Sequence, residues 1–146
     1  MSNKSESHTP IYREINLEFR PLTSSRKKIE RKILLKGLIV KEFGKDLKKI
    51  QERCKNHRLL INAVFYLMES EQKGRSKPDI DNLLKILLDV LSINMVNGQS
   101  PVPGVGLIHD DSQIYEIRCK KIPLDGNFDR EGLDLQISVF KQNLGE

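Results

Sequence analysis

The sequence predicts one α+β domain, in which a mixed β-sheet has two main helices packed on it. The chain has 146 residues, 38% of them hydrophobic, which is enough for one core but marginal for two. Apolar residues alternate with polar ones in some segments, which predicts strands, and recur at helical spacing in others, which predicts helices. The polar N-terminus predicts a disordered tail over 1–10 and a domain over 11–146.

The N-terminal half predicts a strand, a long helix and a second strand. Alternating apolar residues place the first strand over 11–19, where a Pro-containing turn ends it. Helical spacing then continues from about 29 to 56, with a break or kink at Gly44. The apolar segment 58–68 predicts a central strand. A helix there is the alternative.

The C-terminal half predicts a second helix and two further strands. The helix extends over about 81–92 and has one apolar face. A Gly/Pro-rich segment follows over 94–106. Strands are predicted over 113–122 and 133–140; the facing of the first is ambiguous, whereas the second alternates cleanly.

Positive charge is concentrated in one part of the chain. Between Arg26 and Arg58 there are 13 Lys and Arg against 4 Asp and Glu, a local charge of +9 within a total of +5, which leaves −4 elsewhere. A basic helix can be a solvated surface and nothing more. In a small basic domain, however, it favours a polyanionic partner, and nucleic acid is the first candidate.

Several classes of protein are disfavoured. Lys and Asp interrupt the apolar segments, so none is suited to span a bilayer, and the N-terminus lacks the apolar core of a secretory signal. We therefore expect a cytoplasmic protein without membrane contact. There is no phosphate-binding loop motif, so no nucleotide cofactor is expected. Cys54 and Cys119 match no metal-binding spacing and are predicted to be reduced, partly buried thiols.

Two aspartates lie where the second helix is predicted to begin. Asp79 and Asp81 are followed one turn later by Lys85. One interpretation is structural: acids cap a helix and complement its dipole, and Asp81 with Lys85 is a favourable i,i+4 pair. The other is a cation site, because in an extended chain side chains at i and i+2 point the same way, and paired carboxylates are ligands that Mg2+ prefers.

A third carboxylate is available further along the chain. Asp110 and Asp111 precede the strand over 113–122. Their sequence is also that of an ordinary turn. Asp89, on the predicted helix, is expected to be a structural partner.

The motifs PDIDNLLK (78–85) and DDSQI (110–114), with Lys121 in the strand that follows, resemble the RusA family of Holliday-junction resolvases. These are small endodeoxyribonucleases of bacteria, prophages and phages. The resemblance is specific over about residues 75–121, and upstream the predicted elements are consistent with it.

The resemblance implies roles for individual residues. Three aspartates of each subunit, here Asp79, Asp81 and Asp111, are expected to hold Mg2+, and Lys85 is expected to be needed for cleavage. The sequence does not decide whether Asp110 shares or replaces the role of Asp111. The residues expected to contact DNA are Arg75, Lys77 and Lys121.

The function implied is Mg2+-dependent, structure-specific cleavage of DNA that resolves four-way junctions by paired symmetric nicks, during recombination and repair. The expected partner is branched double-stranded DNA. The near two-fold symmetry of a junction suits a C2 homodimer, which the resemblance also implies. Two alternatives stay open: a basic DNA-binding protein without catalysis, whose acids are helix caps, and a nuclease that acts on other branched DNA.

Overall fold

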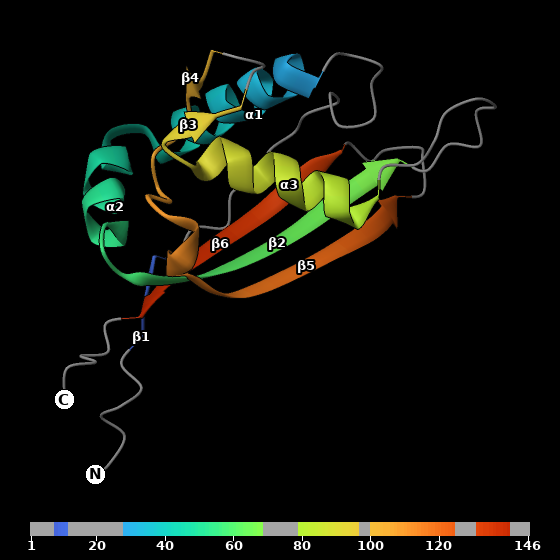
Figure 1. Cartoon of the computed structure of the whole chain (residues 1–146). Helices are drawn as coiled ribbons and strands as arrows, with labels where there is room; N and C mark the ends of the chain where they lie inside the picture. Colours follow the sequence, from blue (N-terminus) through green and yellow to red (C-terminus); the bar gives the residue numbers. More distant parts are fainter. Residues whose placement is uncertain (1–7, 12–27, 69–78, 97–99, 125–130, 141–146) are drawn as a thin grey trace, which may run out of the picture.

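A computed structural model describes the chain over 8–11, 28–68, 79–96, 100–124 and 131–140. In these stretches a mixed β-sheet carries helices on one face (Figure 1). The predicted α+β class is thereby confirmed. The sheet has four strands in the order β1–β6–β2–β5, with the bounds β1 (His8–Ile11), β6 (Gly132–Phe140), β2 (Arg58–Met68) and β5 (Ile114–Leu124).

The direction of the strands fixes the direction of one helix. β2 and β5 are parallel neighbours, whereas β6 pairs antiparallel with β1 and β2. Parallel neighbours need a crossover connection, and here it contains α3 (Ile80–Leu91). α3 therefore begins near the ends of β2 and β5 and returns toward their beginnings (Figure 1).

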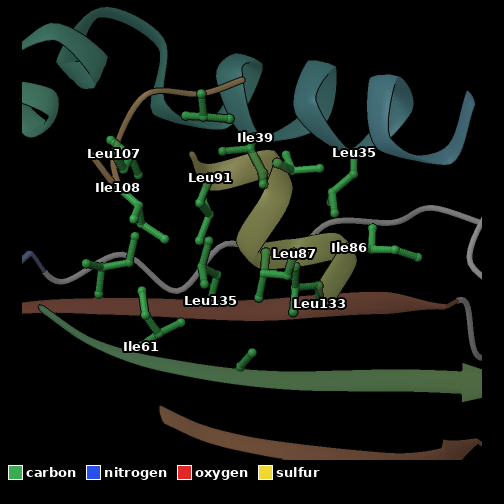
Figure 2. Packing of buried hydrophobic residues seen from close by; sticks show 14 of the residues in the cluster. Leu35, Ile39, Ile61, Ile86, Leu87, Leu91, Leu107, Ile108, Leu133 and Leu135 are labelled. Carbon is green, nitrogen blue, oxygen red and sulfur yellow. The ribbon is translucent and has the colours of Figure 1, made fainter. Parts of the chain in front are cut away.

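The core lies between the sheet and the helices. Every second residue of β2 and of β6 is buried on the helix-covered face, and α1 (Lys28–Phe43) and α3 contribute the opposing side chains (Figure 2). Burying each large aliphatic side chain stabilises the fold by about 1.5–3 kcal/mol. This alternation in β2 is that of a strand, so the helix considered for residues 58–68 is wrong. The core residues labelled in Figure 2 include Leu35, Ile39, Ile61, Leu87 and Leu135.

The long basic helix is broken where the sequence predicts it. α1 ends at Phe43, a single 3-10 turn covers Gly44–Asp46, and α2 extends over Leu47–Cys54. Gly44 has a φ of +54°, in the left-handed region that glycine adopts without a Cβ penalty. No helix in the described part of the chain is long and apolar enough to cross a membrane.

The first described strand begins within the segment 1–10 that the sequence predicts as a tail. His8, Thr9 and Pro10 belong to β1, which pairs with the last residues of β6. A strand edge leaves backbone groups to be satisfied, and a polar segment can satisfy them without an apolar pattern of its own. Beyond Ile11, the strand predicted over 11–19 lies outside the described residues.

The Gly/Pro-rich segment packs on the C-terminal end of α3 and the residues after it bond to that end. It contains the short strands β3 (Asn94–Met95) and β4 (Val102–Pro103), and its continuation donates backbone hydrogen bonds to the last carbonyls of the helix. Val105 N donates to Val90 O at 2.7 Å, and Leu107 N donates to Leu91 O at 2.8 Å. Carbonyls at a helix end have no partner within the helix, so this segment supplies them.

This close approach depends on Gly104. A Cβ at that position would lie 2.1 Å from the carbonyl oxygen of Ser92, which is backbone and cannot rotate away. We expect Gly104→Ala to lower the free energy of unfolding by about 1–3 kcal/mol. The matched control is Gly37→Ala on α1, where nothing lies within 4 Å of the new methyl group and a gain of about 0.5–1 kcal/mol is expected. Urea unfolding measures the stability of both variants. Equal effects of the two substitutions would contradict the steric role assigned to Gly104.

Candidate active site

Asp79 stands at the N-terminus of α3 with its carboxylate unused by the helix. Its backbone is extended, with φ −75° and ψ 150°, and its side chain forms no capping hydrogen bond. Instead its carbonyl oxygen accepts from Leu83 N at 3.1 Å. The side chain of Asp79 therefore does not cap the helix, and its exposed carboxylate is available for a ligand.

Asp81 and Lys85 are exposed on the first turns of α3. The predicted i,i+4 ion pair between them is not formed, and Lys85 forms no salt bridge with any other described residue. Both carboxylates at this end of the helix lie in the positive potential of its N-terminus, which favours bound anionic groups. Asp79, Asp81 and Lys85 thus lie on the same end of α3 without forming salt bridges with one another.

Asp89, on the same helix, is bound in the fold. Its Oδ2 lies 2.5 Å from Lys32 Nζ on α1, and the side chains of the pair are only 16% and 10% exposed. The carboxylate also accepts from Val96 N, at 3.0 and 3.2 Å to its two oxygens. Asp89 therefore joins α1, α3 and the segment after α3, which confirms the structural role expected for it.

Asp110 and Asp111 have different surroundings. Asp110 caps the 3-10 turn Asp111–Gln113: its Oδ1 accepts from Ser112 N at 3.0 Å, and its backbone N donates to Gln113 Oε1 at 2.9 Å. Asp111 is exposed, and its carboxylate makes no hydrogen bond or ion pair within the described residues. Of the two acids, Asp111 is the one whose two carboxylate oxygens are both unused by the described residues.

Asp111 lies at the opposite end of α3 from the first two acids. Ile108, three residues before it, donates a backbone hydrogen bond to Leu91 O and bridges to Ser92 at the helix C-terminus. α3 has 12 residues, so its ends are about 18 Å apart. Across the described stretches, no three His, Cys, Asp or Glu side chains are close enough to hold a metal ion. One chain alone therefore does not bring the three predicted ligands together.

Both cysteines have raised pKa values. Both are free thiols, as predicted. Burial raises the pKa of Cys54 to about 12, against a weaker opposing effect of Arg53, and burial also raises the pKa of Cys119. Both therefore stay protonated at neutral pH, when a metal ligand needs the thiolate.

The predicted DNA contacts are only partly described. Arg75 and Lys77 lie outside the described residues. Lys121 pairs across the strands with buried Phe65, so it points to the helix-covered face of β5, in the half of the strand near which α3 begins. The same register places Cys119 on this face and settles the facing of the strand.

Part of the basic segment has internal partners. Lys32 pairs with Asp89, and Lys36 Nζ donates to Pro103 O at 2.8 Å. These two cations hold α1 to the chain around the end of α3. The cations that remain exposed on α1, α2 and the turns beside them are Lys28, Lys41, Lys45, Lys48, Lys49, Arg53 and Lys55.

One pair near Asp111 was not predicted. The Arg58 guanidinium carbon lies 4.6 Å from the centre of the Tyr115 ring, which is a cation–π distance, and Tyr115 is 60% exposed. The register of β5 shifts here, since Leu59 pairs with Ile114 but Leu60 pairs with Glu116, so Tyr115 is left without a partner. No local spacing in the sequence indicates a bulge of this kind.

Comparison with known proteins gives the family of the chain. A sequence model of the family described as Endodeoxyribonuclease RusA matches residues 18–128, which is most of the chain. No curated protein matches it. The match defines the class as an endodeoxyribonuclease that acts on branched DNA. The chain belongs to the RusA family, the family of Holliday-junction resolvases indicated by its two aspartate motifs.

Proposed function

We propose that this protein is a Mg2+-dependent, structure-specific endonuclease that resolves four-way DNA junctions by paired symmetric nicks during recombination and repair. The observation that supports this best is the N-terminus of α3 in a chain of the RusA family: Asp79 and Asp81 are exposed there, free of capping bonds, with Lys85 one turn away. Such an enzyme acts in the cytoplasm of a bacterial cell, encoded by a chromosome, a prophage or a phage.

Asp79, Asp81 and Asp111 are the proposed ligands of Mg2+. Three carboxylates offer the hard oxygen atoms that this ion prefers. When bound, Mg2+ supplies Lewis-acid polarisation of the scissile phosphate. Lys85, whose ammonium group is not bound in a salt bridge with a described residue, would pair with that phosphate as a point charge.

The position of Asp111 supports a homodimer. Asp79 and Asp81 stand at one end of α3 and Asp111 near the other, so the third ligand must come from another copy if all three hold one ion. In a C2 dimer each subunit then supplies Asp79 and Asp81 to one site and Asp111 to the other. The two equivalent sites would face the two opposing strands that must be cut.

Contacts to the DNA backbone would come from basic side chains around these sites. Arg75, Lys77 and Lys121 are proposed at the site itself, and the exposed lysines and arginines of α1 and α2 beyond it. Phosphate contacts position the DNA without reading its sequence, and they make affinity fall as salt rises.

A synthetic four-way junction with labelled arms tests the proposal. With Mg2+ we expect nicks at symmetric positions on two opposing strands, and with EDTA binding without cleavage, because the acids serve the metal and the cations serve the DNA. Flapped and linear duplexes of the same sequence are the controls. Cleavage that persists in EDTA would contradict the metal requirement. Faster cutting of the flap than of the junction would favour a nuclease for other branched DNA.

A further inference from the structure

Gln113 is a buried hub beneath the turn that carries Asp111. Its Oε1 accepts hydrogen bonds from His109 N at 2.7 Å and from Asp110 N at 2.9 Å. Its Nε2 donates to Cys54 O and to His57 O, both at 2.8 Å. The side chain amide therefore uses two acceptor and two donor positions, all with backbone groups.

These four bonds connect two parts of the chain that are distant in sequence. His109 and Asp110 form the start of the Asp111 turn, whereas Cys54 and His57 lie where α2 ends and β2 begins. The amide thus fixes the turn to the corner between α2 and β2. Buried polar groups satisfied in this way hold one conformation, because any other arrangement leaves some of them without partners.

Asp111 itself has no such support. It is exposed, and no described residue forms a hydrogen bond or salt bridge with its carboxylate. The backbone of its turn therefore sets where the Asp111 side chain starts and the region that its carboxylate can reach. The conformation of that turn is set by the hydrogen bonds of Gln113 and Asp110.

We infer that Gln113 is a positioning residue, which orients Asp111 toward the site that the proposed function assigns to it. Gln113 would touch neither the metal ion nor the DNA. Its contribution is to hold a ligand in place before the ion binds. Outer partners of this kind affect metal affinity and turnover without contacting the reacting atoms. The inference rests on the proposed function and adds a residue to it.

Gln113→Met removes all four hydrogen bonds and keeps a side chain of similar length. We expect the cleavage rate at saturating junction to fall about 10- to 100-fold and the Mg2+ concentration for half-maximal rate to rise. Junction affinity in EDTA should stay at the parental value, because no phosphate contact is lost. In amide exchange, the His109 and Asp110 N–H groups should lose their protection.

Gln51→Met is the matched control. Gln51 also ties two segments together, since its Nε2 donates to Val105 O at 2.8 Å, but it forms no bond with the Asp111 turn. We expect this variant to lose stability and to keep the parental cleavage rate and Mg2+ requirement at temperatures where it is folded. A purely structural role for Gln113 predicts the same behaviour in both variants.

The outcomes are distinguishable. Parental Mg2+ dependence and cleavage rate in Gln113→Met, with loss of stability alone, would overturn the inference and leave the proposed function standing. Failure of the parent protein to cut the junction with Mg2+ would overturn the proposed function and the inference with it. If Gln113→Met does not fold, Gln113→Asn replaces it. That variant keeps an amide too short to reach both sides, and the same change in rate and Mg2+ requirement is expected.

Discussion

Asp81→Asn abolishes junction cleavage and leaves junction binding intact: this is the largest effect we expect from a single substitution. Asparagine keeps the size of the side chain but removes the negative charge that would hold a divalent cation. The loss should exceed the 10- to 100-fold effects typical of residues that only support a metal ligand. Cleavage with Mg2+ and gel-shift binding with EDTA measure the two properties separately.

Asp89→Asn is the control on the same helix. Asp89 lies two turns after Asp81 and is bound to Lys32 and to Val96 N instead of facing solvent. We expect the free energy of unfolding of this variant, measured in urea, to fall by about 1–3 kcal/mol. While it is folded, it should cut junctions at the parental rate. If Asp81→Asn cut as fast as the parent, or if Asp89→Asn alone were inactive when folded, the site would be wrongly assigned.

Mixing two inactive variants should restore cleavage. If each site combines Asp79 and Asp81 of one subunit with Asp111 of the other, a dimer of Asp81→Asn with Asp111→Asn has one site with both changes and one site with neither. Random pairing of equal amounts then gives about a quarter of the parental number of intact sites. Co-refolded mixtures, assayed on a labelled junction, should produce nicks on one strand at a time.

The matched mixture is Asp79→Asn with Asp81→Asn. These residues belong to the same half of the site, at the N-terminus of α3, so every site in the mixed dimer keeps one change. This mixture should stay inactive. Restoration by both mixtures, or by neither, would contradict a site shared between subunits, and the second result would place all three acids within one chain.

Local pattern was enough to predict most elements. The bounds predicted for the central strand are those of β2, and the helix predicted over 81–92 is α3, shifted by one residue. The break at Gly44 was also predicted. In each case the signal comes from neighbouring residues: uninterrupted apolar character, one apolar helical face, and a glycine where the periodicity pauses.

Features that depend on distant segments could not be predicted in the same way. β1 begins within a polar tail, because its partner is the end of β6. The facing of β5 depends on the bulge at Tyr115, which only its pairing with β2 creates. Gln113 falls at the start of a predicted strand, and its four partners lie in two parts of the chain, at 54–57 and at 109–110.

The candidate site shows the same division. The two motifs predicted Asp79, Asp81 and Asp111 as metal ligands, and the structure shows that all three are exposed. Their separation follows from the parallel arrangement of β2 and β5, which sends α3 back along the sheet. No spacing in the sequence carries that information, so convergence of all three acids within one chain was an expectation that the topology does not meet.

The length of α3 bears on whether one subunit could cut DNA alone. On the proposed arrangement, α3 separates the two sets of ligands within a subunit, Asp79 with Asp81 at one end and Asp111 at the other. The helix has 12 residues, so no side-chain rotation can bring the two sets together. On that arrangement a lone subunit would not cut DNA. Cutting would begin only after two copies have met, so both sites of a pair would be complete before any junction is bound.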